Sequence, residues 1–380
     1  MSKKTGAAAV IYPYIPHYRV PVFRTLAAND GTRGYEFFAG KNTVDATIKS
    51  EEPGDKSVSK YAPTFTVFGL TFQFGLLRLC FSREYRHLVF LGDPHFITTW
   101  IYAALARIAG KKVWFWTHGW LRLEAGAKGW MRKFFYCIPN GLLLYGERAR
   151  SIGAQSGLDP KRLHVIYNSL DYDKQRAVRE RLQSEFLRDS FAVEVPSWLR
   201  VEPYFACIAR LTDLCRFDLA IEALSRLKKE NGIDIGMVFI GDGPLRDALQ
   251  ELAFRLGVRC WFAGAIYDEE TIGRFLYNAR AVVSPGKVGL TAMHSLAYGT
   301  PVISHNDFEK QMPEFEAITP GKTGDFFAAG SAADLAMVML RWINKVRDDG
   351  ERKACYARIE ECYTPQRQRD FIEIALRTQD

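Results

Sequence analysis

The chain has 380 residues, of which 48% are hydrophobic and 25% charged, and its formal net charge is +8. This composition excludes a disordered or fibrous protein, and a chain of this length is expected to form two domains of comparable size. No segment approaches the roughly eighteen apolar residues of a membrane-spanning helix, and the N-terminus lacks a signal-peptide pattern. The positive charge favours an anionic partner, such as a nucleotide-sugar, an anionic lipid surface or nucleic acid.

The cysteines are scattered, and their number, seven, is odd. Scattered cysteines between apolar residues predict reduced thiols in a cytoplasmic protein. Their spacing fits no metal-binding pattern, so the sequence predicts no metal site. The sequence also lacks a GxGxxG motif, so no dinucleotide cofactor is expected.

Strands and helices alternate in the first half of the chain, as in a doubly wound parallel sheet. The predicted strands are 7–12, 35–40, 64–70, 87–93, 112–116 and 142–146, and the predicted helices are 20–28, 72–81, 98–109, 147–155 and 174–188. A charged loop rich in glycine and proline is expected at 41–60.

Three polar residues in this half follow predicted strands. His118 comes just past the strand at 112–116, where parallel sheets place ligand contacts, although a core or capping histidine is the alternative. His17 and Arg19 lie in the proline- and tyrosine-rich loop after the first strand, where a capped loop with a surface arginine is equally compatible.

A segment with two prolines and no periodicity, 193–203, predicts the domain boundary. We therefore expect an N-terminal domain over 1–192 and a C-terminal domain over 193–364. Strands predicted at 204–209, 237–240, 260–264 and 281–283 alternate with helices and indicate a second parallel sheet. Further helices are expected at 332–348 and 365–377.

The stretch 283–306 reads as a strand, a glycine-bearing turn, a helix from Gly289 to Tyr298 and a further strand. The N-terminus of such a helix presents free backbone N–H groups that suit a diphosphate, and Lys287 adds a positive charge. A purely structural turn is the alternative.

This stretch resembles the donor-site segment of family-4 glycosyltransferases, which have the GT-B fold and transfer sugar from a nucleotide-sugar with retention of configuration. Gly289-Leu290 and the run 296–301 match the family pattern, whereas Gly286 and His294 stand where the family has glutamates. The resemblance implies an α/β protein with two Rossmann-like doubly wound domains facing an interdomain cleft. It also implies an acceptor in the first domain, a donor in the second, and a helix over 365–380 that crosses back to the first domain.

The resemblance assigns roles to particular residues. Arg210 matches the family's diphosphate-binding arginine, for which a surface arginine is the alternative, and His118 matches a histidine close to the transferred sugar. Cys215 replaces the family lysine, so either Arg216 or Lys287 is expected to supply its charge. These enzymes use cations and a helix N-terminus instead of a metal. The donor-binding candidates are Arg210, Arg216, Gly286, Lys287, Val288, Gly289, Leu290, His294 and Tyr267, the catalytic candidates are His118 and Arg210, and the acceptor-side candidates are His17 and Arg19.

Two runs in the first domain, 74–90 and 130–139, mix basic residues with aromatic and aliphatic ones. Such runs suit a peripheral contact with anionic lipid at the inner face of a membrane, where a lipid-linked acceptor could be met. Two core helices with basic outer faces are the alternative.

The resemblance therefore implies a retaining glycosyltransferase that acts on a glycan or lipid-linked acceptor, as in the assembly of bacterial surface polysaccharides or glycoconjugates. Two alternatives remain open. One is a non-catalytic GT-B binding or scaffold subunit, which the missing glutamates and Cys215 favour. The other is transfer to modified nucleic acid, against which stands the lack of a recognised nucleic-acid-binding module.

Overall fold

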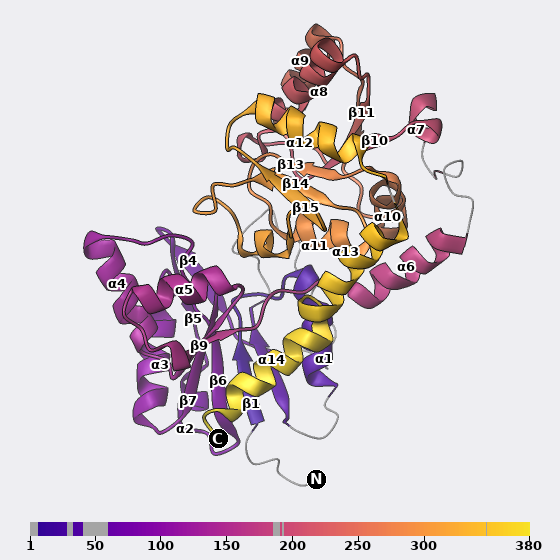
Figure 1. Ribbon diagram of the computed structural model, residues 1–380. Coiled ribbons are helices and arrows are strands. Elements are labelled where there is room, and N and C mark those ends of the chain that lie inside the picture. The colour runs from indigo at the N-terminus through magenta and orange to yellow at the C-terminus, as the bar shows by residue number, and fades with distance from the viewer. Residues whose placement is uncertain (1–6, 29–32, 41–59, 185–190, 192–193, 347) are drawn as a thin grey trace. The chain divides into compact units, whose positions relative to one another are not determined.

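The computed structural model describes residues 7–28, 33–40, 60–184, 191, 194–346 and 348–380 (Figure 1). The predicted loop at 41–60, apart from its last residue, and the predicted helix end at 185–188 lie outside the described residues. The chain forms two compact units, which we call unit 1 (Met1–Asp171 with Thr364–Asp380) and unit 2 (Tyr172–Tyr363).

The division between the units lies before the predicted boundary at 193. Helix α6 (Tyr172–Ser184) packs against α10 (Glu269–Asn278) and α11 (Leu290–Ala297), and its Arg179 donates a hydrogen bond of 3.0 Å to the carbonyl of Ala297. The apolar face of α6 is therefore covered by unit 2. The prolines that suggested a boundary flank only a short helix, α7 (Ser197–Val201).

Unit 1 contains a parallel sheet in the order β3-β2-β1-β6-β7-β8-β9. The strands are β1 (Ala7–Ile11), β2 (Tyr35–Ala39), β3 (Lys60–Tyr61), β6 (Tyr85–Leu91), β7 (Lys112–Thr117), β8 (Gly141–Leu144) and β9 (Leu163–Val165). The helices are α1 (Val20–Ala27), α2 (Leu77–Phe81), α3 (Ile97–Ile108), α4 (Gly126–Cys137), α5 (Glu147–Gln155) and α14 (Pro365–Arg377), with 3-10 turns η1 (His17–Arg19) and η2 (Pro160–Arg162).

Both faces of this sheet are covered by apolar side chains. Successive residues of a strand point to opposite faces, so Trp114 and Trp116 of β7 pack in one cluster and Val113 and Phe115 in the other. Helices α1 and α14 cover the first face, and Figure 1 shows the yellow α14 alongside α1. Helices α2 to α5 contribute to the second cluster. This is the doubly wound arrangement expected from the sequence.

The helix predicted at 72–81 is wrong over its first half. Residues Leu70–Gln73 form strand β5, which pairs antiparallel with β4 (Thr64–Val67), and only Leu77–Phe81 is helical. Phe68 and Gly69, with φ of 48° and 75°, make the tight turn between these strands. Gly75, with φ of 80°, separates β5 from α2, because an α-helix cannot continue through a left-handed residue.

Unit 2 contains a second parallel sheet, in the order β12-β11-β10-β13-β14-β15. The strands are β10 (Tyr204–Ile208), β11 (Gly236–Ile240), β12 (Cys260–Gly264), β13 (Val282–Ser284), β14 (Val302–His305) and β15 (Gly324–Phe327). Besides α6, α7, α10 and α11, the helices are α8 (Phe217–Asn231), α9 (Arg246–Leu256), α12 (Ala332–Asn344) and α13 (Asp349–Cys362), with 3-10 turns η3 (Asp213–Cys215) and η4 (Pro313–Ala317).

The predicted helix at 332–348 is also too long. Helix α12 ends at Asn344, and a separate helix, α13, begins at Asp349. The sequence did not predict α13, because its buried stripe is narrow and is built from Cys355, Ile359 and Cys362. Helix α13 is held in place by tertiary contacts, including an ion pair of 2.8 Å between the buried side chains of Arg280 and Glu351.

Candidate functional site

Each sheet has one point at which the strand order reverses. In unit 1 it lies between β1 and β6, and in unit 2 between β10 and β13. Open parallel sheets bind ligands beyond the carboxyl ends of the strands at such points, because the loops on either side diverge there. Functional groups are therefore expected in the loops that follow these strands.

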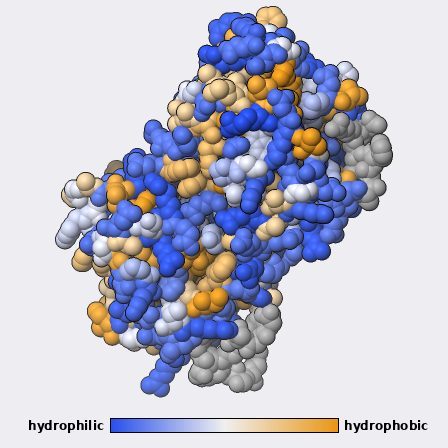
Figure 2. Space-filling view, viewed as in Figure 1, coloured by the Kyte–Doolittle hydropathy of each residue, from blue (hydrophilic) through white to orange (hydrophobic). Residues whose placement is uncertain are grey.

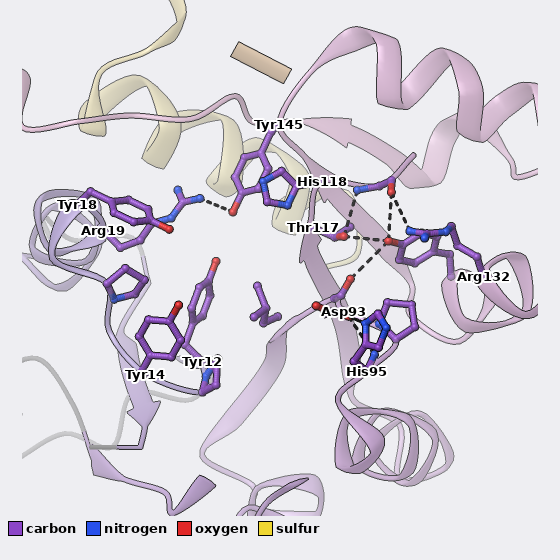
Figure 3. Close-up of a pocket in the computed structure, with 17 residues that line it drawn as sticks. Tyr12, Tyr14, Tyr18, Arg19, Asp93, His95, Thr117, His118, Arg132 and Tyr145 are labelled. Carbon is purple, nitrogen blue, oxygen red and sulfur yellow. Dashed lines mark hydrogen bonds and ion pairs between the residues drawn. The ribbon is translucent and has the colours of Figure 1, made fainter. Parts of the chain in front are cut away.

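Unit 1 carries a cavity of about 370 Å³ at this position (Figure 3). It is lined by residues that follow β1, β6, β7 and β8, and tyrosines predominate: Tyr12, Tyr14, Tyr18, Tyr136 and Tyr145. Figure 3 shows Tyr12 and Tyr14 across the cavity from Asp93 and His95. Aromatic rings with hydroxyl groups supply both apolar faces and hydrogen-bonding groups to a ligand.

Arg19 lies at the inner wall of this cavity, with only 3% of its surface exposed. Its Nη1 donates a hydrogen bond of 2.7 Å to Asn168 Oδ1, and its Nη2 donates to the hydroxyl of Tyr145. The guanidinium also stacks on the rings of Trp116 and Tyr145. Arg19 is therefore a fixed buried cation and not a surface arginine. His17 is exposed on η1 and does not line the cavity.

His118 follows β7, and its ring opens onto the cavity. The ring packs edge-on against Tyr145 with 4.7 Å between centroids. The surrounding protein, and then the charge of Arg19, lower the pKa of His118 to about 4, although Asp93 acts in the opposite direction. At neutral pH the imidazole is therefore uncharged, with one nitrogen that donates and one that accepts a hydrogen bond.

Several lining residues were not predicted from the sequence. Asp93 and His95 follow β6, where the backbone N–H of His95 donates a 3.0 Å hydrogen bond to Asp93 Oδ1 and His95 Nδ1 lies 2.7 Å from the same oxygen. Tyr145 follows β8 directly. Asp93 and Tyr145 fall at the ends of the strands predicted at 87–93 and 142–146, and His95 comes just after the first of these strands. The carboxyl end of a buried strand is the signal that identified His118, so the same rule could have found them.

In unit 2, two loops meet beyond β10 and β13. The N–H of Gly286 donates to the carbonyl of Cys215 (3.0 Å), and the hydroxyl of Thr291 donates to the carbonyl of Ile208 (3.1 Å). A Cβ atom at Gly286 would lie 1.9 Å from the carbonyl oxygen of Leu214. Position 286 is therefore a point of close backbone contact, and this loop arrangement leaves no room there for a glutamate side chain.

The structure distinguishes the two candidate arginines. Arg210 is exposed at the end of β10, and no group of the described residues pairs with its guanidinium. Arg216 adopts a left-handed conformation, with φ of 50°, and pairs with Asp218 at 2.9 Å. Arg210 is thus available to an anionic ligand, whereas the charge of Arg216 is already neutralised by the first turn of α8.

The predicted anion-binding turn leads into α11, which begins at Leu290 with Gly289 as its N-cap. Lys287 is exposed, while the N–H of the buried Val288 donates to Gln311 Oε1 at 2.7 Å and is unavailable to a ligand. First-turn N–H groups of a helix have no intrahelical partner. The α11 N-terminus can therefore offer such donors beside Lys287.

His294 does not point freely toward a ligand. Its Nε2 lies 2.8 Å from Glu269 Oε1, which also accepts a 2.7 Å hydrogen bond from the hydroxyl of Tyr298. Burial raises the pKa of Glu269, but the hydrogen bonds from His294 and Tyr298 outweigh it and hold the pKa below its usual value. Glu269 was not predicted from the sequence. Tyr267, in the loop that precedes α10, is 74% exposed.

This network leads to a stability prediction. Replacing Glu269 by glutamine should lower the free energy of unfolding at pH 7 by roughly 1–3 kcal/mol, because hydrogen bonds to a charged group are lost. A carboxylate with a lowered pKa stabilises the fold above its unfolded pKa of about 4.3 and loses that contribution as pH falls through the folded pKa. The difference between wild type and Glu269→Gln in urea unfolding should therefore shrink at low pH.

Glu270 provides a matched control, since it is adjacent on α10, its side chain is 45% exposed, and it forms surface ion pairs with Arg181 and Arg274. Its replacement by glutamine should change the free energy of unfolding by less than about 0.5 kcal/mol. Equal effects of the two substitutions would contradict a special role for the Glu269 network.

Residues 196–359, which all lie within unit 2, match the family model for glycosyl transferases group 1. A GDP-mannose-dependent alpha-(1-6)-phosphatidylinositol dimannoside mannosyltransferase of Mycobacterium tuberculosis is 31% identical over 153 residues, which is 40% of this chain and 37% of the relative. A glycogen synthase of Hydrogenovibrio crunogenus is 24% identical over 183 residues, 46% of this chain and 37% of the relative. The chain thus spans little more than a third of the curated relatives it matches.

Solved structures resemble the chain over almost its whole length. The lipopolysaccharide outer core galactosyltransferase WaaB has a TM-score of 0.71 at 16% identity, covering 98% of this chain and 100% of that one. Anabaena HepE in complex with UDP has a TM-score of 0.69 at 14% identity, with the same coverage. These likenesses confirm the predicted fold class, a GT-B α/β fold with two Rossmann-like units.

Proposed function

We propose that this chain is a nucleotide-sugar-dependent glycosyltransferase. The observation that carries the proposal is in unit 2, where the guanidinium of Arg210, which has no partner among the described residues, and the N-terminus of α11 flank one sheet reversal point. The match of residues 196–359 to glycosyl transferases group 1 supports it.

Unit 2 is proposed to hold the donor through its diphosphate. Arg210 offers two parallel N–H donors that suit phosphate oxygens, and the α11 N-terminus adds backbone N–H groups and a partial positive charge. Lys287, three residues before the start of α11, adds a second positive charge. As the bond to the sugar breaks, negative charge grows on the leaving diphosphate, and fixed donors of this kind stabilise it.

Unit 1 is proposed to hold the acceptor in its tyrosine-lined cavity. A volume of about 370 Å³ is suitable for a sugar-sized group. Tyrosine rings can pack on the apolar faces of a sugar, while Asp93 and neutral His118 can hydrogen-bond to its hydroxyl groups. The acceptor class is a glycan or lipid-linked saccharide, as in the assembly of bacterial surface polysaccharides or glycoconjugates.

The transfer is proposed to proceed with retention and without a resident metal, as the family resemblance implies. We assign no protein side chain as general base; a phosphate oxygen of the leaving group would take the proton of the acceptor hydroxyl. Activity should therefore persist in EDTA.

A donor screen tests the proposal. Released nucleotide would be measured for a panel that begins with GDP-mannose and UDP-glucose, which the names and titles of similar proteins suggest, and product anomers would be assigned by NMR. Transfer with retained configuration is the expected result. Failure to bind any nucleotide or nucleotide-sugar in calorimetry would instead favour a non-catalytic binding subunit.

A further inference from the structure

The β4–β5 hairpin of unit 1 exposes apolar side chains that a folded protein usually covers. Phe68 at its tip is 100% exposed, and Phe65, Val67 and Leu70 are 59%, 52% and 39% exposed. Because scattered single apolar residues are ordinary but contiguous ones mark contact surfaces, this hairpin points to a partner.

The exposed apolar surface continues from the hairpin across three helices. Phe65 packs against Phe74 beyond β5, and β5 and α2 both pack against α3. Trp100 of α3 in turn stacks on Phe134 of α4. We call the exposed apolar residues of these elements the docking face: Phe65, Val67, Phe68, Leu70, Phe74, Leu77, Phe81, Ile101, Ile108, Trp130, Met131 and Phe134. Figure 2 shows hydrophobic side chains on the surface in the region of α4.

The charges of this segment indicate what covers the docking face. Residues 60–137 contain eleven Lys and Arg but only three Asp and Glu. Arg78, Arg107 and Lys133 are exposed and lie on α2, α3 and α4, the three helices that contribute to the docking face. An apolar surface with a basic surround suits the interface of an anionic bilayer, where phosphates meet the cations and acyl chains meet the rings. Within the described residues, no helix is both long and apolar enough to cross a membrane.

The hairpin is joined to the wall of the tyrosine-lined cavity. Gln73 Nε2 donates a 2.8 Å hydrogen bond to the carbonyl of Tyr12, and the hydroxyl of Thr64 donates a 3.1 Å hydrogen bond to the carbonyl of Pro13. The N–H of Thr71 donates to the carbonyl of His95 at 2.9 Å. Tyr12, Pro13 and His95 all line the cavity. A bilayer bound at the hairpin is therefore held close to the cavity.

We propose that unit 1 docks on an anionic lipid bilayer through the docking face, with the hairpin tip inserted at the interface. The cavity then receives the polar head of an amphiphile that remains in the membrane. The docking itself is independent of the proposed function, whereas the amphiphilic acceptor rests on it.

Vesicle co-sedimentation of the full chain tests the docking. Vesicles of phosphatidylcholine with phosphatidylglycerol should bind the chain, and pure phosphatidylcholine should bind it much more weakly. Phe68→Asn should reduce binding roughly tenfold, since an apolar ring is lost from the interface. Asparagine tolerates the left-handed conformation of position 68, so the fold is retained. Lys133→Glu should weaken binding further, by several-fold for the lost charge.

Phe254 of α9 is the matched control, because it is 88% exposed but lies in unit 2. Phe254→Gln should leave vesicle binding unchanged. Equal binding by the Phe68 and Phe254 variants, or no vesicle binding by wild type, would overturn the proposal. Self-association without vesicles that Phe68→Asn abolishes would also overturn it, in favour of a protein interface. Nucleotide binding measured on the same samples separates failure of this proposal from failure of the proposed function.

Discussion

Replacing Arg210 by alanine is expected to weaken nucleotide-sugar binding about 10- to 150-fold, or roughly 1.5–3 kcal/mol, because a charge-assisted contact with phosphate is lost. The guanidinium is exposed at the end of β10 and is unpaired among the described residues. Its removal therefore leaves no buried partner unsatisfied, and the fold should be unaffected. Isothermal titration with the best donor of the screen measures the loss.

Arg216 is the matched control for Arg210, a choice that depends on the structure. Its charge is engaged by Asp218, so Arg216→Ala should change donor affinity by less than about threefold, or 0.6 kcal/mol. Unchanged affinity in the Arg210 variant would remove our assignment of the diphosphate site. A larger loss at Arg216 than at Arg210 would reverse the roles of the two residues.

The second large effect is expected at Gly286. Replacing it by alanine should destabilise unit 2 by about 1–3 kcal/mol and lower donor affinity as well, because the added Cβ would lie 1.9 Å from the carbonyl of Leu214. The loop must move apart from η3, and the N-terminus of α11 then shifts relative to Arg210. Urea unfolding and titration with the donor measure the two effects.

Lys287→Ala tests the same loop without a steric conflict. Lys287 is exposed, so stability should stay within about 0.5 kcal/mol of wild type while donor affinity falls. If Gly286→Ala unfolds at the wild-type urea concentration, the close contact with Leu214 is not a constraint on the loop.

Local patterns were sufficient for most elements. The strand at 112–116 and the helix at 147–155 were expected close to the bounds of β7 and α5, because buried parallel strands are short apolar runs and helices repeat every three or four residues. Strand β4 lies within the strand predicted at 64–70, but the end of β5 was misread as the start of a helix, since its apolar residues also fit helical spacing. The narrow stripe of α13 was too weak to detect.

The sequence by itself determined the fold class and the loops that follow the strands, because strand ends in a parallel sheet are visible as the ends of apolar runs. Only the tertiary structure decided which side chains in those loops are available. It buried Arg19 in the cavity wall, engaged Arg216 with Asp218, and paired His294 with Glu269. These side-chain partners depend on how loops and helices that are distant in the sequence pack together. The local pattern of the sequence does not predict that packing.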